Sequence, residues 1–150
     1  MYKRILVAID GSKTSAGALE EACKLARGAD ARLRIVHVID SPYAYADAWY
    51  TAGSVDVEAV ERAWRRAGQE ILDRAVAQAR EAGSPAESAL LETDGRRVSR
   101  AIVDDAEGWP AEVIVIGSHG RHGMEQLLIG SVAESVTRTA RLPVLLVRAR

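Results

Sequence analysis

Two patterns of apolar and polar positions alternate along the chain. Short, continuously apolar runs predict strands that are covered on both faces, and apolar residues that recur at three- and four-residue steps predict helices with one buried side. Helical patterns fill the intervals between five strand-like runs, at residues 5–9, 33–39, 89–91, 113–116 and 144–147. This alternation predicts an α/β protein built from βαβ units.

Four helices are expected, with ends read from glycine, proline and polar residues. The first is expected to end at Gly28, and the second is a long helix that begins near Asp56. A third precedes the run at 113–116, and the last is expected to run from Leu128 to Ala140. These helices would connect successive strands of one sheet.

Composition narrows the class of protein. The chain has 150 residues, 48% of them apolar, which is enough for one sizeable core, so we expect a single domain over residues 1–150. The formal net charge is −1, which gives no field to attract nucleic acid or an anionic membrane. Cys23 is the single cysteine, which fits a reducing compartment, and no apolar stretch has membrane-spanning length. We therefore expect a cytoplasmic protein that binds neither nucleic acid nor membranes.

The glycines after the most apolar run form a candidate anion site. Gly117 and Gly120 follow residues 113–116 directly, and Gly130 and Ser131 come after nine further residues, where a helical pattern begins. Glycines let backbone N–H groups approach an anion closely, and a helix N-terminus adds partial positive charge. The spacing predicts a phosphate cradle; the alternative is that the glycines only form turns.

This spacing, with residues 3–12 and 143–148, resembles the universal stress protein family over nearly the whole chain. The resemblance implies a Rossmann-like fold, a single open parallel five-stranded sheet in the order 3-2-1-4-5 with helices on both faces. It also implies a stress-response protein that binds ATP, alone or with Mg²⁺ or Mn²⁺, and acts as a sensor or regulatory module. The site residues implied are Gly117, Gly120, Gly130 and Ser131 for phosphates and ribose, and the main chain of Val38 for adenine.

The implied strand order brings two distant features together. Strands 1 and 4 would be neighbours, and their carboxyl ends would form a crevice at the switch point of the sheet, where Asp10 and Gly117 meet. Asp10 could accept a hydrogen bond from ribose or adenine or share a divalent cation, or it could form an Asx turn. Ser131 could donate to a phosphate or cap the last helix. Arg121 could reach a phosphate or remain a solvated surface residue.

Several kinds of catalytic site are not supported. Gly11-Ser12-Lys13-Thr14 fails the P-loop pattern, and neither G-x-G-x-x-G nor G-x-S-x-G occurs. We therefore assign no catalytic residue and expect at most slow ATP hydrolysis or autophosphorylation. His119 and His122 lack further clustered ligands, so no metal site is assigned, and His37 is expected to be a packed histidine. The competing functions are an ATP-using enzyme and an interaction module with an empty crevice.

Two surface features concern association. The run at 89–91 is short with polar neighbours, and Pro143 opens the strand Val144–Val147, so both strands are expected at sheet edges. An open apolar edge is covered if it pairs with the same strand of a second copy. The resembling family dimerises similarly, and we expect a homodimer through Val144–Val147. The aromatic segment from Tyr43 to Tyr50 could be a lid or could pack against the domain or a partner.

Overall fold

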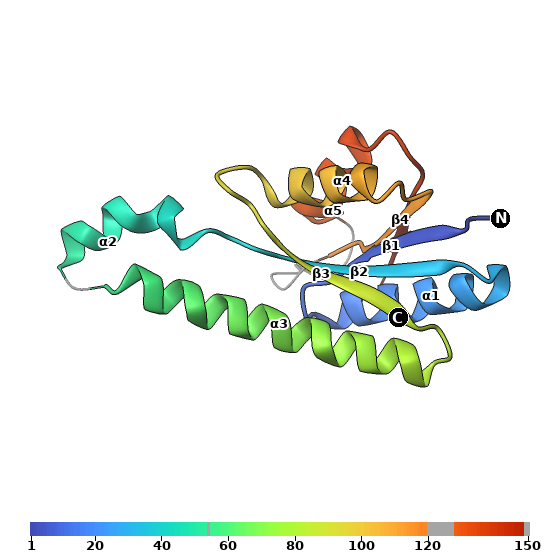
Figure 1. The fold of residues 1–150 in the computed structure, drawn as a ribbon. Coiled ribbons are helices and arrows are strands. Elements are labelled where there is room, and N and C mark those ends of the chain that lie inside the picture. Colours follow the sequence, from blue (N-terminus) through green and yellow to red (C-terminus); the bar gives the residue numbers. More distant parts are fainter. Residues whose placement is uncertain (54, 120–127, 149–150) are drawn as a thin grey trace.

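The computed structural model describes residues 1–53, 55–119 and 128–148. Its strands form one parallel five-stranded sheet in the order β3-β2-β1-β4-β5 (Figure 1). This order confirms the predicted fold and places β3 and β5 at the edges. The strands are β1 Arg4–Ala8, β2 Arg32–Ile39, β3 Ala86–Glu92, β4 Val113–Gly117 and β5 Val144–Val147.

Helices cover both faces of the sheet, with α1 and α3 on one face and α4 and α5 on the other (Figure 1). The side chains of β1 show why its run is continuously apolar: Ile5 and Val7 enter the core under α1 and α3, whereas Leu6 and Ala8 enter the core under α4 and α5. None of the described helices is long and apolar enough to span a membrane. The helices are α1 Lys13–Ala29, α2 Ala46–Ala52, α3 Val57–Glu81, α4 Val98–Gly108 and α5 Ser131–Thr139, with a short 3-10 helix η1 Pro42–Tyr45.

Two predicted helix ends are wrong. The first helix continues through Gly28 to Ala29, and Asp30 ends it in the left-handed conformation (φ 48°, ψ 52°), where its amide donates to two carbonyls of the last turn. Aspartate tolerates this conformation better than most residues, so no glycine is needed there. The last helix begins at Ser131, as the position of Gly130 and Ser131 predicts, so its expected extension back to Leu128 is wrong; Leu128 precedes the helix and is 78% exposed.

Two segments contain more regular structure than the sequence predicts. β3 extends from Ala86 to Glu92 because seven of its residues pair with β2, which draws polar positions such as Glu87 and Ser88 into the ladder. The aromatic segment after β2 folds as η1 and α2. These two elements and the first turns of α3 extend beyond the end of the sheet (Figure 1).

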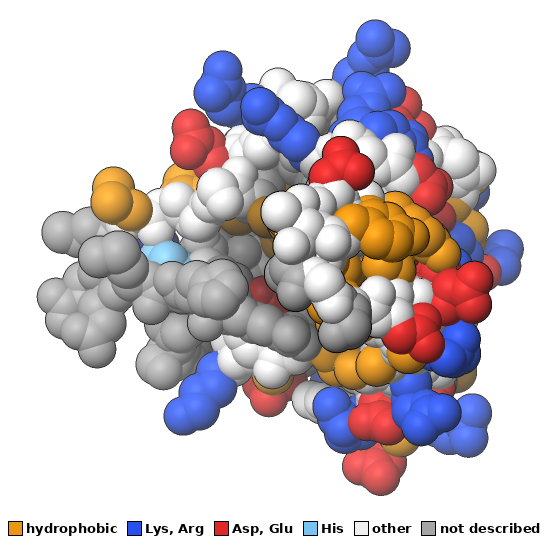
Figure 2. All heavy atoms as spheres, turned by 90° about the vertical axis from the view of Figure 1, so that its left-hand side faces the viewer, with side chains coloured by type: hydrophobic (Ala, Val, Ile, Leu, Met, Phe, Trp, Pro, Cys, Tyr) orange, Lys and Arg blue, Asp and Glu red, His pale blue; other side chains and the backbone are white. Residues whose placement is uncertain are grey.

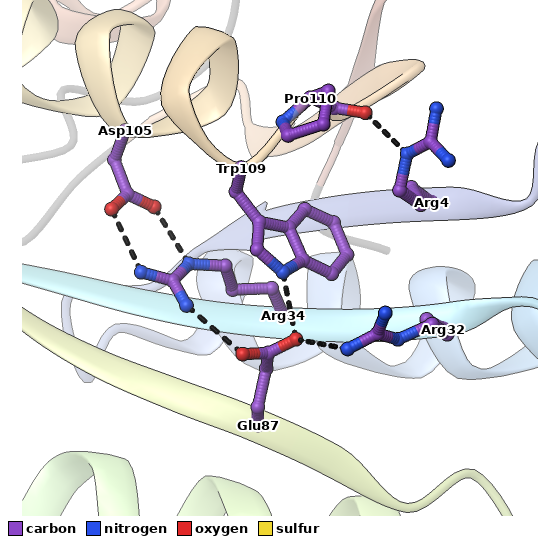
Figure 3. Close-up of polar contacts among 7 residues, drawn as sticks. All are labelled: Arg4, Arg32, Arg34, Glu87, Asp105, Trp109 and Pro110. Carbon is purple, nitrogen blue, oxygen red and sulfur yellow. Dashed lines mark hydrogen bonds and ion pairs between the residues drawn. The ribbon is translucent and has the colours of Figure 1, made fainter.

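A polar cluster fastens α4 to the β2–β3 edge of the sheet (Figure 3). The Arg34 guanidinium donates to both carboxylate oxygens of Asp105, at 2.8 and 2.9 Å, and to Glu87 at 3.1 Å. Trp109, which follows α4, donates its indole N–H to Glu87 at 2.7 Å. Arg32, the first residue of β2, also reaches Glu87, so the cluster lies towards the amino end of the strands.

Candidate functional site

A cavity of about 620 Å³ lies where β1, β2 and β4 end. Figure 2 views the molecule from the side to which these carboxyl ends point, and apolar side chains gather there among charged ones. The predicted residues Gly120 and Arg121, and also His122, lie outside the described residues. All the other predicted site residues line the cavity, namely Asp10, Val38, Gly117, Gly130 and Ser131.

The cavity is lined from both faces of the sheet. α4 and the start of α5 contribute Val98, Ile102 and Ala133 from one face. α3 contributes residues from the other face, at the helical spacing i, i+3, i+4 and i+7. These are Trp64, Ala67, Gly68 and Ile71. The space is therefore mainly apolar and is lined by residues from both faces of the sheet.

The N-terminus of α5 opens into this cavity. Gly130 is the N-cap residue, with φ −61° and ψ 152°, and among the described residues no side chain caps the helix. The first hydrogen bond within the helix joins the amide of Glu134 to the carbonyl of Gly130, at 2.9 Å. The amides of residues 131–133 therefore precede the helical hydrogen-bond ladder and carry the positive end of the helix dipole. Such an arrangement accepts an anion.

Two details differ from the predicted cradle. The amide of Gly130 donates to the carbonyl of Ser118 at 2.6 Å, so the backbone itself uses this donor. Ser131 is the first residue of α5, not its cap, so the capping role considered for its hydroxyl is wrong. The amides that precede the helical hydrogen-bond ladder are therefore those of residues 131–133, one to three residues after Gly130.

Gly117 is required by packing at the end of β4. A Cβ there would lie 2.9 Å from Thr14 Cγ2, 3.1 Å from the Thr14 carbonyl carbon and 3.2 Å from the Ser15 amide nitrogen. The first turn of α1 thus approaches β4 closely at the cavity. Packing alone accounts for this glycine, and its contact with a phosphate stays a prediction.

Asp10 forms the Asx turn that was one of its predicted roles. Its Oδ1 accepts from the amide of Ser12 at 2.9 Å, and its own amide donates to Ser15 Oγ at 3.3 Å. Ser12 in turn caps α1 by accepting from the amide of Ser15 at 3.1 Å. The turn holds the Asp10 carboxylate in the lining of the cavity, so the two predicted roles do not exclude each other.

The main chain of Val38 points past the end of β1. The carbonyl of Val36 accepts from the amide of Ile9 at 2.9 Å, just beyond the paired residues of β1 and β2. Backbone polar groups alternate in direction along a strand, so those of Val38 face the same side as those of Val36. β1 has ended at that level, and the cavity begins. The neighbouring His37 has its side chain on the face of the sheet opposite to the side chains of Val36 and Val38. It is buried, with Nδ1 2.8 Å from the Ile9 carbonyl oxygen, as expected of a packed histidine.

Two lining residues were not recognised as site residues from the sequence. His119 Nδ1 contacts Ser118 Oγ at 2.9 Å, and its buried Nε2 has no hydrogen-bond partner in the part of the chain that the structure describes. The sequence presented His119 only as an incomplete metal ligand. Trp64 is an apolar residue of α3, and nothing in the local sequence indicates that this part of the helix reaches the cavity.

The charges of the lining are uneven. Asp10 and Asp40 contribute carboxylates, whereas no lysine or arginine is among the described lining residues. Within residues 1–53, 55–119 and 128–148, the groups of the lining that carry partial positive charge are therefore backbone amides at helix N-termini and not basic side chains. A ligand with one small anionic group and a large apolar part fits this distribution.

A parallel sheet in this order, with a cavity at its switch point, defines an open α/β protein of the doubly wound class. The model of the Universal stress protein family matches residues 1–148, and the chain belongs to that family.

Individual relatives agree over almost the whole chain. Universal stress protein MJ0531 of Methanocaldococcus jannaschii is 35% identical, over 99% of this chain and 83% of its own. The universal stress protein of Archaeoglobus fulgidus in complex with dAMP is 28% identical, with a TM-score of 0.68, and the match covers 97% of this chain and 98% of that one. A universal stress protein in complex with cAMP is 25% identical, also with a TM-score of 0.68, and the match covers 99% of this chain and 98% of that one.

Proposed function

We propose that this member of the universal stress protein family binds an adenine nucleotide in the cavity and acts as a stress-response sensor or regulatory module. The observation that carries the proposal is the uncapped N-terminus of α5, which opens into a largely apolar space. The volume, about 620 Å³, lies within the usual range for small-molecule sites. Relatives in complex with dAMP and cAMP support the choice of an adenine nucleotide.

Each part of a nucleotide has a matching group in the lining. The amides of residues 131–133 would receive the phosphate nearest the ribose. The Asp10 carboxylate would accept from a ribose hydroxyl, because a carboxylate beside bare phosphate oxygens would be repelled. The N–H and C=O of Val38 would pair with the edge of the adenine, which carries both acceptors and a donor.

The charges of the lining affect how many phosphate groups the cavity can accommodate. Asp10 and Asp40 oppose further negative charge, and the described lining offers no basic side chain against them. ATP would therefore bind best with Mg²⁺ or Mn²⁺, which offsets the charge of the outer phosphates. Because no catalytic set is assigned, hydrolysis or autophosphorylation would be slow. A cytoplasmic location stays a prediction.

Isothermal titration calorimetry with AMP, ATP, ATP with Mg²⁺, and GTP tests the proposal. We expect saturable heat with the adenine nucleotides and weaker binding of GTP, whose ring presents a different edge to Val38. No heat with any nucleotide would support the interaction module with an empty crevice. Rapid phosphate release from ATP would instead support the ATP-using enzyme.

We also propose that the protein is a homodimer through the free edge of β5. The Pro143 carbonyl accepts from the amide of Ile114 in β4 at 3.0 Å, and the Val147 carbonyl accepts from the amide of Ser118, just after β4, at 2.8 Å. Backbone direction alternates along the strand, so the polar groups of Val144 and Leu146 face the open edge. An unpaired edge of this kind binds a second strand readily, and the 37% exposed side chain of Leu145 adds apolar surface.

Leu146→Pro is expected to make the protein monomeric in light scattering coupled to gel filtration. Proline removes an N–H that faces the open edge and takes no part in pairing with β4, so the sheet itself should persist. Leu146→Ala is the matched control, because it loses a similar apolar side chain but retains the N–H and should remain dimeric. A dimeric Leu146→Pro protein would place the interface elsewhere.

A further inference from the structure

We propose that Trp64 is the stacking wall for the base of the bound ligand, an inference that rests on the proposed nucleotide site. Trp64 is half-buried and lines the cavity from α3, on the face of the sheet opposite to α5. Anion-binding amides on one side and an indole on the other suit a ligand with a charged end and a flat aromatic end. A nucleotide has this shape.

The packing of α3 determines where Trp64 lies. One turn after it, Gly68 approaches the sheet so closely that a Cβ would lie 2.8 Å from Leu90 Cδ1, 3.0 Å from Ile39 Cγ2 and 3.1 Å from His37 Cδ2. Since α3 touches the sheet at Gly68, residues one turn earlier lie beyond Ile39, where β2 ends. The small side chain of Ala67 leaves space beside the indole.

Contacts from two sides hold this turn of α3. The neighbouring Arg65 donates to Glu61 at 2.9 Å and pairs with Glu92 at the end of β3. On the outer side, Trp49 of α2 meets Trp64 edge to face, with ring centroids 6.2 Å apart. Tyr45 stacks on Trp49 with centroids 5.9 Å apart. The indole of Trp64 is therefore braced before any ligand arrives, which lowers the entropic cost of stacking.

These aromatic contacts also give the segment from Tyr43 to Tyr50 a role. The ring contacts run from Tyr45 through Trp49 to Trp64, which lines the cavity. Trp49 would act as a positioning residue that sets the tilt of the Trp64 ring. The segment then contributes to the site as a brace behind one wall.

The three tryptophans of the chain allow a direct fluorescence test. In a Trp49→Phe/Trp109→Phe variant Trp64 is the only tryptophan, and an aromatic ring is kept at position 49 behind it. In a Trp49→Phe/Trp64→Phe variant Trp109 is the only tryptophan, and calorimetry verifies that this control still binds AMP. Trp109 lies towards the amino end of the sheet, beside Arg32 and Glu87 (Figure 3). Because it is far from the cavity, it serves as the control residue. We expect AMP to quench or shift the emission of Trp64 saturably and to leave the emission of Trp109 unchanged.

Calorimetry adds an affinity measurement on the same ligand. Trp64→Ala is expected to weaken AMP binding about tenfold or more, because stacking of a base on an aromatic ring contributes substantially to affinity. Trp64→Phe should retain most of the affinity, and Trp109→Phe should retain all of it. If Trp64→Ala does not fold, the Trp64-only protein still reports the contact.

Failure of this inference is distinguishable from failure of the proposed function. If wild-type protein binds AMP while Trp64 emission stays constant and Trp64→Ala binds normally, the stacking role is overturned and the nucleotide site stands. If wild-type protein gives no heat with AMP or ATP, both proposals are overturned.

Discussion

Gly117→Val is expected to destabilise the protein by about 3 kcal/mol, at the upper end of the cost of overpacking a well-packed site. The new Cβ would lie within 3.2 Å of backbone atoms of Thr14 and Ser15, which cannot rotate away as a side chain end would. Valine has a higher β propensity than glycine, so a loss of stability in this strand would come from the steric clash and not from strand propensity. A lower midpoint of urea denaturation with an unchanged slope is the expected observation.

The same substitution should also abolish AMP binding at temperatures where the variant is folded, because displacing the first turn of α1 moves Asp10 and Ser15 in the cavity lining. Gly28→Ala is the matched control. A Cβ at Gly28 meets no atom within 4 Å, and this glycine lies inside α1, so alanine should be neutral or stabilising by up to about 1 kcal/mol. A Gly117→Val protein as stable as wild type would mean that β4 and α1 do not approach as closely as described.

Ser131→Pro is expected to weaken AMP binding roughly 10- to 100-fold, the effect of losing one hydrogen bond to a charged group. Proline removes the first amide of α5, which has no carbonyl partner within the helix. It should leave the helix intact, since proline suits the first helical position. The preceding Gly130, at φ −61° and ψ 152°, already has the extended conformation that a residue before proline prefers.

Ser131→Ala separates the amide from the hydroxyl. It removes only the Oγ and should cost less affinity than proline, with thermal unfolding close to that of wild type in both variants. Calorimetry with AMP and a melting curve for each protein provide the comparison. Equal affinities of the proline and alanine variants would show that the Ser131 amide does not bind the phosphate.

Most of the fold could be predicted from the apolar pattern. Runs such as 5–9 and 113–116 are continuously apolar because helices cover both faces of the sheet. This pattern can be read from the sequence alone, without knowledge of the tertiary structure. The helix ends were less predictable. Asp30 could take a left-handed conformation in place of glycine, and Leu128 continued the apolar period of α5 without joining the helix. Local periodicity cannot distinguish an apolar loop residue from a helical one.

The site could be predicted only where a local motif or the implied strand order carried it. Asp10, Val38 and Gly117 reach one cavity because parallel strands end at the same edge, and the strand order implied this meeting. The hydrogen bond from the Gly130 amide to the Ser118 carbonyl joins residues that are twelve positions apart, and the spacing of the glycines does not encode it. Trp64 likewise needed the direction of α3 across the sheet.

The position of the polar cluster formed by Arg34, Asp105 and Glu87 separates stability from ligand binding. It lies towards the amino end of the sheet, while every group assigned to the ligand lies at the other end. Stabilising polar contacts and cavity-lining residues thus occupy opposite ends of the strands. Substitutions in this polar cluster should therefore change the stability of the fold without changing the residues that line the cavity.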